Sequence, residues 1–241
     1  MGMASYGKKG KDYSFAKGKF QEILWYDNNG GIDGNPHLLS LGDKTFSDYC
    51  SDAFVAHLGK PSRTSNEKIK QWHKNFALAA QDHLEEIVQA LVKFWVEKTK
   101  IRNLCLAGGV AMNVKMNGNL FESNFLDSVY VYPVAADAGT SIGGAMALQY
   151  KNGIKYKNSK ISHVYLGNSF TDNEIKKILE KCQITYQCPR NLEAYVANVL
   201  ASGKIVGWFQ TGMEAGQRAL GARSILADPR KIKLRDRVNS V

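Results

Sequence analysis

Residues 103–113 have the sequence Asn-Leu-Cys-Leu-Ala-Gly-Gly-Val-Ala-Met-Asn, in which a short apolar run ends at two glycines. The apolar run predicts a buried strand, and Gly108-Gly109 predicts the turn after it. A helix, a second strand through residues 129–132 and a Gly/Ala-rich helix beginning near Asp137 are expected next. This alternation of strands and helices predicts an α/β sheet with ligands at the strand ends.

Upstream of this segment, the sequence predicts one long amphipathic helix. Residues 64–67, Thr-Ser-Asn-Glu, resemble a capping box, in which a hydroxyl and a carboxylate accept the first free N–H groups. Apolar residues then recur every three or four positions, as expected of one buried stripe: Ile69, Trp72, Phe76, Ala80, Leu84, Ile87, Leu91 and Phe94. The first sixty residues are predicted to be irregular, with a clear turn at residues 28–31.

Downstream, residues 151–160 are rich in lysine and asparagine and poor in apolar side chains, which is typical of a linker. We therefore place a domain boundary near residues 155–162, with domains at residues 1–155 and 163–241. In the second domain we expect helices and strands in the order helix 171–182, strand 184–188, helix 191–202 and strand 205–210.

The composition, with 44% hydrophobic and 22% charged residues in 241, is that of a soluble globular protein. The sequence has no apolar run of roughly 20 residues and no signal-peptide pattern, so we expect a cytoplasmic protein without a membrane partner. None of the four cysteines forms a C-x-x-C pair, and we expect reduced, mostly buried thiols. The net charge of +10 is scattered, which argues against nucleic acid and is compatible with phosphorylated small molecules.

Three segments are candidate sites. In the first, Gly108 and Gly109 would let the backbone approach a phosphate, and Asn113 would hydrogen-bond a base or ribose, although a tight strand–helix junction explains the glycines without a ligand. In the second, Asp137 follows a strand and could cap the next helix or bind a metal, and the spacing favours the cap.

The third candidate is the segment from Thr211 to Arg230. Its glycines predict a flexible loop, which also carries Arg218 and Arg223. Arg218 and Arg223 are planar donors suited to phosphate or carboxylate, and Ser224 adds a neutral donor. A solvated basic loop without a ligand is the alternative interpretation.

Taken together, these segments resemble the nodulation- and cephem-type O-carbamoyltransferases. Residues 1–7, M-G-M-A-S-Y-G, look like the family's M-G-L-A-x-Y-G, and G-G-V-A-M-N at residues 108–113 and D-A-G at 137–139 match two further elements. The family's M-E-x-G-x-R-A-L-G-x-R-S-I-L-A-D-P-R is matched almost completely from Met213 to Arg230. This last match is long and specific, and the resemblance covers essentially the whole chain.

The resemblance implies an α/β fold in which part of an actin-like (ribonuclease-H-like) transferase domain is followed by the start of a YrdC-like domain. The second domain would form carbamoyl-adenylate from carbamoyl phosphate and ATP with Mg²⁺. The first would transfer the carbamoyl group to a hydroxyl of a small-molecule acceptor. A divalent metal, expected to be iron, would assist this transfer. The implied roles are nucleotide binding by Gly108, Gly109 and Asn113, binding of carbamoyl phosphate and ATP by Arg218, Arg223 and Ser224, and metal binding by Asp137.

Two family elements are missing. The family has an H-x-x-x-H metal-binding pair well upstream of M-G-L-A-x-Y-G, whereas no two of the five histidines here are four residues apart. The family also continues past D-P-R into a run like K-x-R-E-x-F-R-P, which this chain lacks. One carboxylate rarely holds a catalytic metal, so we expect these 241 residues alone to lack both activities.

Three alternatives stay open at this point: a sugar kinase of the actin-like superfamily, a non-catalytic nucleotide-binding module, and a tRNA-modifying enzyme. A kinase would need no arginine-rich second domain, and it would convert ATP into ADP rather than AMP and pyrophosphate. A tRNA-modifying enzyme would bind tRNA tightly and in a salt-dependent way.

Overall fold

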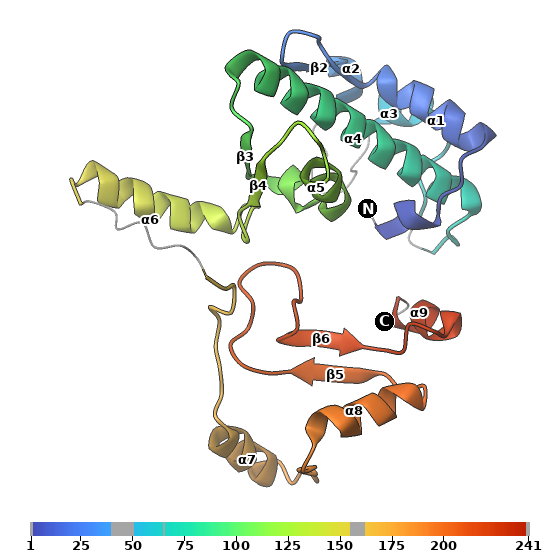
Figure 1. Cartoon of the computed structure of the whole chain (residues 1–241). Helices are drawn as coiled ribbons and strands as arrows, with labels where there is room; N and C mark the ends of the chain where they lie inside the picture. Colours follow the sequence, from blue (N-terminus) through green and yellow to red (C-terminus); the bar gives the residue numbers. More distant parts are fainter. Residues whose placement is uncertain (1, 40–50, 65, 155–161, 240–241) are drawn as a thin grey trace. The chain divides into compact units, whose positions relative to one another are not determined.

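The computed structural model describes residues 2–39, 51–64, 66–154 and 162–239 (Figure 1). Its contacts divide the chain into two compact units, Met1–Tyr132 and Pro133–Val241. This division falls upstream of the boundary expected near residues 155–162, and residues 155–161 of that linker lie outside the described part. Within the described part, no helix is both long and apolar enough to cross a bilayer.

The first unit is built around one long helix, α4, which spans Gln71–Thr99 (Figure 1). The other helices and strands of this unit are η1 (Gly2–Tyr6), α1 (Lys11–Gln21), β1 (Leu24–Tyr26), β2 (Ile32–Gly34), α2 (Pro36–Leu39), α3 (Asp52–Leu58), β3 (Asn103–Leu106), η2 (Gly109–Met112), α5 (Val114–Phe121) and β4 (Ser128–Val131). The prediction that the first sixty residues are irregular was therefore wrong, because α1 forms there. The turn predicted at residues 28–31 is confirmed, since it joins β1 to β2 in an antiparallel pair.

Helix α4 begins later than the capping-box pattern predicts. The Glu67 carboxylate does accept the Thr64 N–H, at 3.3 Å, but this turn precedes the helix. The residue before the first turn of α4 is Lys70, whose N–H donates to Nδ1 of His73 at 2.9 Å. A side chain of the first turn therefore satisfies a backbone donor at the start of α4.

Helix α4 is buried on more than one face rather than along one stripe. On one face, Phe76 and Ala79 pack with Tyr13 and Ala16 of α1. Towards the other end, Val92 packs with Met116, Leu120 and Leu126. Of the predicted stripe, Phe76 and Ile87 are buried, whereas Ile69 is exposed and precedes the helix. Burying each large apolar side chain contributes roughly 1.5–3 kcal/mol.

The predicted order of strands and helices around residues 103–150 is confirmed. Strands β3 and β4 pair in parallel, with Asn103 opposite Ser128 and Leu106 opposite Val131, and α5 crosses between them. Leu104, Leu106 and Val129 pack against the core under α4 and α5. The chain is therefore an α/β protein in this region, because a parallel pair needs such a crossover.

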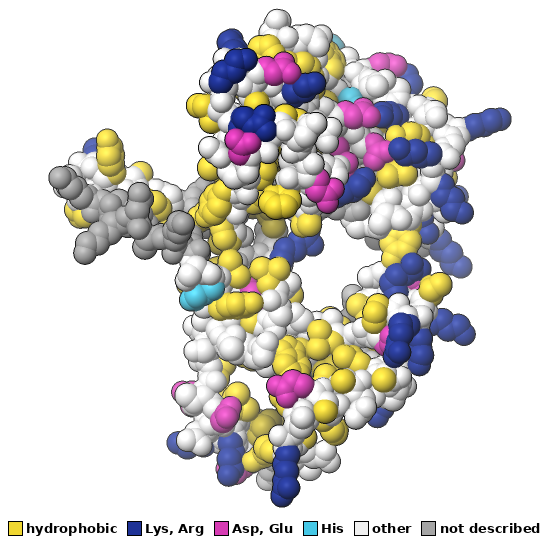
Figure 2. Space-filling view, in the orientation of Figure 1, with side chains coloured by type: hydrophobic (Ala, Val, Ile, Leu, Met, Phe, Trp, Pro, Cys, Tyr) yellow, Lys and Arg dark blue, Asp and Glu magenta, His cyan; other side chains and the backbone are white. Residues whose placement is uncertain are grey.

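The second unit contains α6 (Gly139–Lys151), α7 (Asp172–Lys181), α8 (Leu192–Ala201), β5 (Val206–Phe209), β6 (Arg223–Leu226) and α9 (Ile232–Val238). Three expected elements are confirmed as α7, α8 and β5, but the strand predicted at residues 184–188 is absent from this described stretch. Hydrophobic side chains gather at the surface over β5 and α8 (Figure 2), and Tyr195 and Phe209 are among the exposed residues.

The thiols correct another expectation. Cys105, Cys182 and Cys188 are free, as predicted, but all three are exposed rather than buried. Cys50 lies outside the described residues.

Candidate functional site

A loop between β5 and β6 carries the predicted arginines. The two strands are antiparallel, with Trp208 opposite Ser224 and Phe209 opposite Arg223. Residues 210–222 connect them, and Gln210 N–H donates to the carbonyl of Ala222 at 2.9 Å. The long family motif therefore covers most of this loop and the whole of β6.

The buried carboxylate of Glu214 holds this loop together by accepting hydrogen bonds from its far end. Its side chain is 0% exposed. Oε1 accepts the N–H of Leu220 at 2.6 Å and that of Ala222 at 2.8 Å, and Oε2 accepts Nε of Arg223 at 3.1 Å. Burial by itself would raise the pKa of Glu214, but these donors outweigh it and lower the pKa to about 2. Glu214 is therefore ionised at neutral pH.

Arg223, predicted to bind phosphate or carboxylate, donates hydrogen bonds within its own loop. Besides its ion pair with Glu214, its Nη2 donates to the carbonyl oxygen of Glu214 at 3.2 Å and to that of Gly216. Its side chain is still 39% exposed. Ser224, the next residue, accepts the Gly221 N–H at its Oγ, at 3.1 Å.

Arg218 differs from Arg223 because no carboxylate among the described residues pairs with it. It is exposed, and it makes no hydrogen bond or ion pair with any residue in the described part of the chain. Arg223 and Ser224 are consecutive residues at the start of β6, where successive side chains point to opposite faces of the strand, and Arg218 lies exposed on the loop. An unpaired guanidinium on a fastened loop is suited to binding an anion from solvent.

The end of the motif contains a second buried carboxylate. Asp228 accepts Nε of Arg230 at 2.9 Å and Nη2 at 2.8 Å, and also the Arg230 backbone N–H. These hydrogen bonds lower the pKa of Asp228 to about 2. Arg230 is therefore occupied within its own segment.

The glycine turn lies in the first unit, after β3. Gly108 has φ +94° and ψ 169°, a conformation that side chains strongly disfavour, so a glycine is required there by the backbone. Gly109 starts η2, and apart from the adjoining residues no described atom lies within 4 Å of the place a Cβ would take at either glycine. The flanking residues Ala107 and Val110 line an apolar cavity of about 630 Å³ beside α4.

Asn113 is engaged within the protein rather than open to a ligand. It is buried and caps α5, with Oδ1 accepting the Met116 N–H at 3.2 Å. Its amide also pairs with that of Gln81 on α4, through contacts of 3.0 Å and 2.9 Å. The nucleotide contact implied by the resemblance stays a prediction, and the contacts seen are those of a helix cap.

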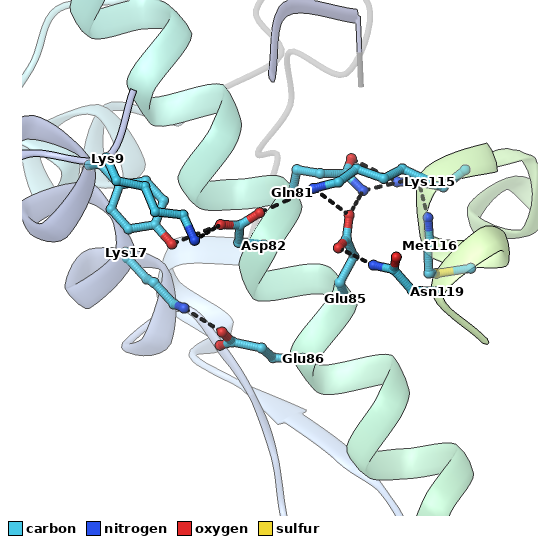
Figure 3. A network of polar contacts seen from close by, with 11 residues as sticks. Lys9, Lys17, Gln81, Asp82, Glu85, Glu86, Lys115, Met116 and Asn119 are labelled. Atoms are coloured by element: carbon cyan, nitrogen blue, oxygen red, sulfur yellow. Dashed lines mark hydrogen bonds and ion pairs between the residues drawn. The ribbon is translucent and has the colours of Figure 1, made fainter. Parts of the chain in front are cut away.

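A polar network between α4 and its neighbours was missed at the level of sequence (Figure 3). Asp82 accepts Tyr13 Oη at 2.9 Å and lies 3.3 Å from both Lys9 Nζ and Lys115 Nζ. Lys115 also lies 3.2 Å from Glu85. Burial would raise the pKa of Asp82, but its hydrogen bonds to Tyr13 and the two lysines lower it. These residues come from three separate segments, at positions 9–13, 82–85 and 115, so no local sequence pattern predicts the network.

Asp137 is exposed and precedes α6. The expected cap is not formed, because the N-cap residue is Ala138 and no side chain caps the helix, while Thr140 donates to the Asp137 carbonyl at 3.0 Å through its N–H. Among the described residues, no group of three or more His, Cys, Asp or Glu side chains is placed to hold a metal ion. Asp137 by itself does not fit a metal site.

Comparison with known proteins gives two family matches. Residues 40–146 match the carbamoyltransferase N-terminus, and residues 197–241 match the carbamoyltransferase C-terminus. The first match contains the glycine turn and Asp137, and the second contains the loop between β5 and β6.

Individual relatives agree with these matches. The chain is 31% identical to nodulation protein NolO of Bradyrhizobium diazoefficiens, over all of this chain and 41% of NolO. It is 34% identical to nodulation protein NolNO of Sinorhizobium fredii, over 74% of this chain and 27% of that protein. An uncharacterised protein of Synechocystis sp. is 34% identical over 83% of this chain and 33% of its own length. The chain thus spans between about a quarter and two fifths of these relatives, and it belongs to the carbamoyltransferase family.

Proposed function

We propose that this chain is part of an O-carbamoyltransferase that activates carbamoyl phosphate with ATP and passes the carbamoyl group to a hydroxyl of a small-molecule acceptor. The observation that carries this proposal is the exposed guanidinium of Arg218, which has no partner among the described residues, on a loop held together by Glu214. Family membership and similarity to nodulation proteins support carbamoyl transfer in general. A phosphate-rich substrate also agrees with the net charge of +10.

The proposed reaction has two balanced steps. In the first, carbamoyl phosphate, ATP and water give carbamoyl-adenylate, phosphate and pyrophosphate. In the second, the acceptor hydroxyl attacks the carbamoyl carbon and its oxygen forms the new C–O bond. The bond from this carbon to the phosphate oxygen breaks, so that AMP and the hydroxyl proton are released. The first step crowds negative phosphate groups together, and fixed arginines stabilise such an arrangement.

In this proposal the first step uses the loop of residues 210–222, in a YrdC-like domain, with ATP bound as its Mg²⁺ complex. Arg218 meets a phosphate group, and Ser224 and the remaining donor edge of Arg223 lie at the base of the loop. The turn at Gly108 and Gly109 faces the nucleotide during transfer, in an actin-like domain. No step is assigned to a metal at Asp137, because the described residues offer it no partner ligands.

The proposal is tested by calorimetric titration of the chain with ATP and Mg²⁺. Arg218→Ala is expected to weaken binding about tenfold or more, because a hydrogen bond to a charged group is worth roughly 1.5–3 kcal/mol. Arg190→Ala removes the same charge from an exposed position of the same unit and serves as the matched control, with unchanged affinity expected. Equal affinity of the wild type and Arg218→Ala, or no ATP binding by the wild type, would contradict the proposal.

The identity of the nucleotide product separates this function from a sugar kinase. Wherever turnover is detected, carbamoyl-adenylate chemistry yields AMP and pyrophosphate and depends on carbamoyl phosphate. Formation of ADP with a sugar would instead support a kinase. Ion-exchange chromatography of the nucleotides distinguishes these outcomes.

A further inference from the structure

The buried carboxylate of Glu214 is used by no step of the proposed reaction. Its three donors, the N–H groups of Leu220 and Ala222 and Nε of Arg223, lie six to nine residues further along the chain. One side chain therefore ties the start of the loop to its end. The Leu220 side chain adds little apolar packing to this tie, because it is 57% exposed.

Arg223 is held by the same arrangement. Nε and Nη2 are both used inside the loop, by Glu214 and by the carbonyl of Gly216. Of the guanidinium nitrogens of Arg223, Nη1 alone makes no hydrogen bond with the described residues. The positive charge of Arg223 is balanced by the Glu214 carboxylate. Among the described residues, Arg218 makes no side-chain hydrogen bond and has no carboxylate partner.

We infer that the loop divides two roles between its arginines, with Glu214 as the positioning residue that makes the division possible. The Glu214–Arg223 pair forms the frame of the loop, and Arg218 supplies the charge that meets a phosphate group of the ligand. This inference rests on the proposed function, since it assigns roles within the same anion site. Arg218 is effective because the frame limits where its backbone can move, so less conformational freedom is lost on binding.

A substitution at Glu214 should therefore weaken ligand binding without removing a ligand contact. Glu214→Gln keeps the side chain's size, but its NH₂ group faces donors and its charge is lost. We expect this variant of the full chain to bind ATP with Mg²⁺ about tenfold more weakly than the wild type. Glu174→Gln is the matched control: Glu174 also accepts hydrogen bonds, from Thr171, but it lies on α7, and its substitution should leave ATP affinity unchanged.

A second measurement keeps the inference testable if Glu214→Gln fails to fold, as circular dichroism would reveal. In wild-type protein, the Nε–H resonances of the arginines are followed by nitrogen-15 NMR during an ATP titration. The Arg218 signal is expected to move, whereas the Arg223 signal, held by Glu214, stays in place and exchanges slowly with water.

The outcomes separate the two proposals. Absence of ATP binding by the wild type overturns the proposed function. Wild-type affinity in a folded Glu214→Gln chain overturns only the division of roles, as does an Arg223 signal that moves while that of Arg218 does not. Weaker binding in Glu214→Gln together with a moving Arg218 signal supports both.

Discussion

Residues of the same type make different contacts here because of partners that the sequence does not reveal. Arg218 and Arg223 look equivalent in the sequence, yet only Arg223 is tied to a buried carboxylate. The amide of Asn113 pairs with that of Gln81, which lies 32 residues away, and its predicted nucleotide contact stays a prediction. A sequence motif identifies which residues belong to a candidate site, whereas their contacts depend on the folded chain: Arg223 pairs within its own motif, and Asn113 pairs with a residue of another helix.

The low pKa of Glu214 predicts a pH effect on stability. The carboxyl titrates near 4.5 in the unfolded chain and at about 2 in the folded protein, so its stabilising contribution is complete above pH 4.5 and is lost as the pH falls towards 2. The midpoint of thermal unfolding should therefore fall less steeply between pH 4.5 and 2 in Glu214→Gln than in the wild type. Circular dichroism measures the midpoint. The lowered pKa of Asp228 also makes stability depend on pH, but it does so equally in both proteins. Parallel curves would show that Glu214 is not the titrating group.

The two glycines of the turn should respond differently to alanine. Gly108→Ala forces a side chain into a disfavoured backbone conformation and should cost about 1–3 kcal/mol of stability. Gly109→Ala meets no such strain and no neighbouring atom, so its stability should change by less than about 0.5 kcal/mol while ATP binding weakens. Urea unfolding and calorimetry separate these effects. Unchanged ATP affinity in Gly109→Ala would remove the turn from the nucleotide site.

Among the elements, those with a strong repeating pattern were predicted best. The strands and helices around residues 103–150 follow from apolar runs and glycine turns, and most of α4 follows from its periodicity. Helix α1 was missed because it is rich in lysine and contains a glycine, and it is buried through only a few residues such as Tyr13 and Ala16. The start of α4 was misplaced because the Thr64–Glu67 turn has a cap-like contact without continuing into the helix.

The packing of α5 against α4 gives a direct test at this scale. Leu120 is 0% exposed, so Leu120→Ala should destabilise the first unit by about 2–5 kcal/mol. Phe121 is its neighbour on the same helix and is 73% exposed, so Phe121→Ala should change stability by no more than about 0.5 kcal/mol. Urea denaturation followed by circular dichroism measures both. Similar losses for the two variants would contradict the observed burial.

For the whole molecule, the family motifs predict more than composition and periodicity do. The charge and hydropathy limit the chain to a globular protein, and the α/β arrangement follows from the strand pattern. The long match from Met213 to Arg230 pointed to the carbamoyltransferases, and the family matches at residues 40–146 and 197–241 confirm it. The metal ligand implied at Asp137 stays a prediction, because a metal needs several ligands brought together from distant segments and the described residues place no such group.

The central claim is that the loop between β5 and β6 binds phosphate groups. Its most direct test is to titrate the nitrogen-15-labelled chain with ATP and Mg²⁺ and to follow the backbone amide resonances by NMR. The account predicts that the largest shifts fall on residues 211–224, around Arg218, and that they disappear in Arg218→Ala but persist in Arg190→Ala. Shifts confined to other parts of the chain, or an unchanged pattern in Arg218→Ala, would contradict it.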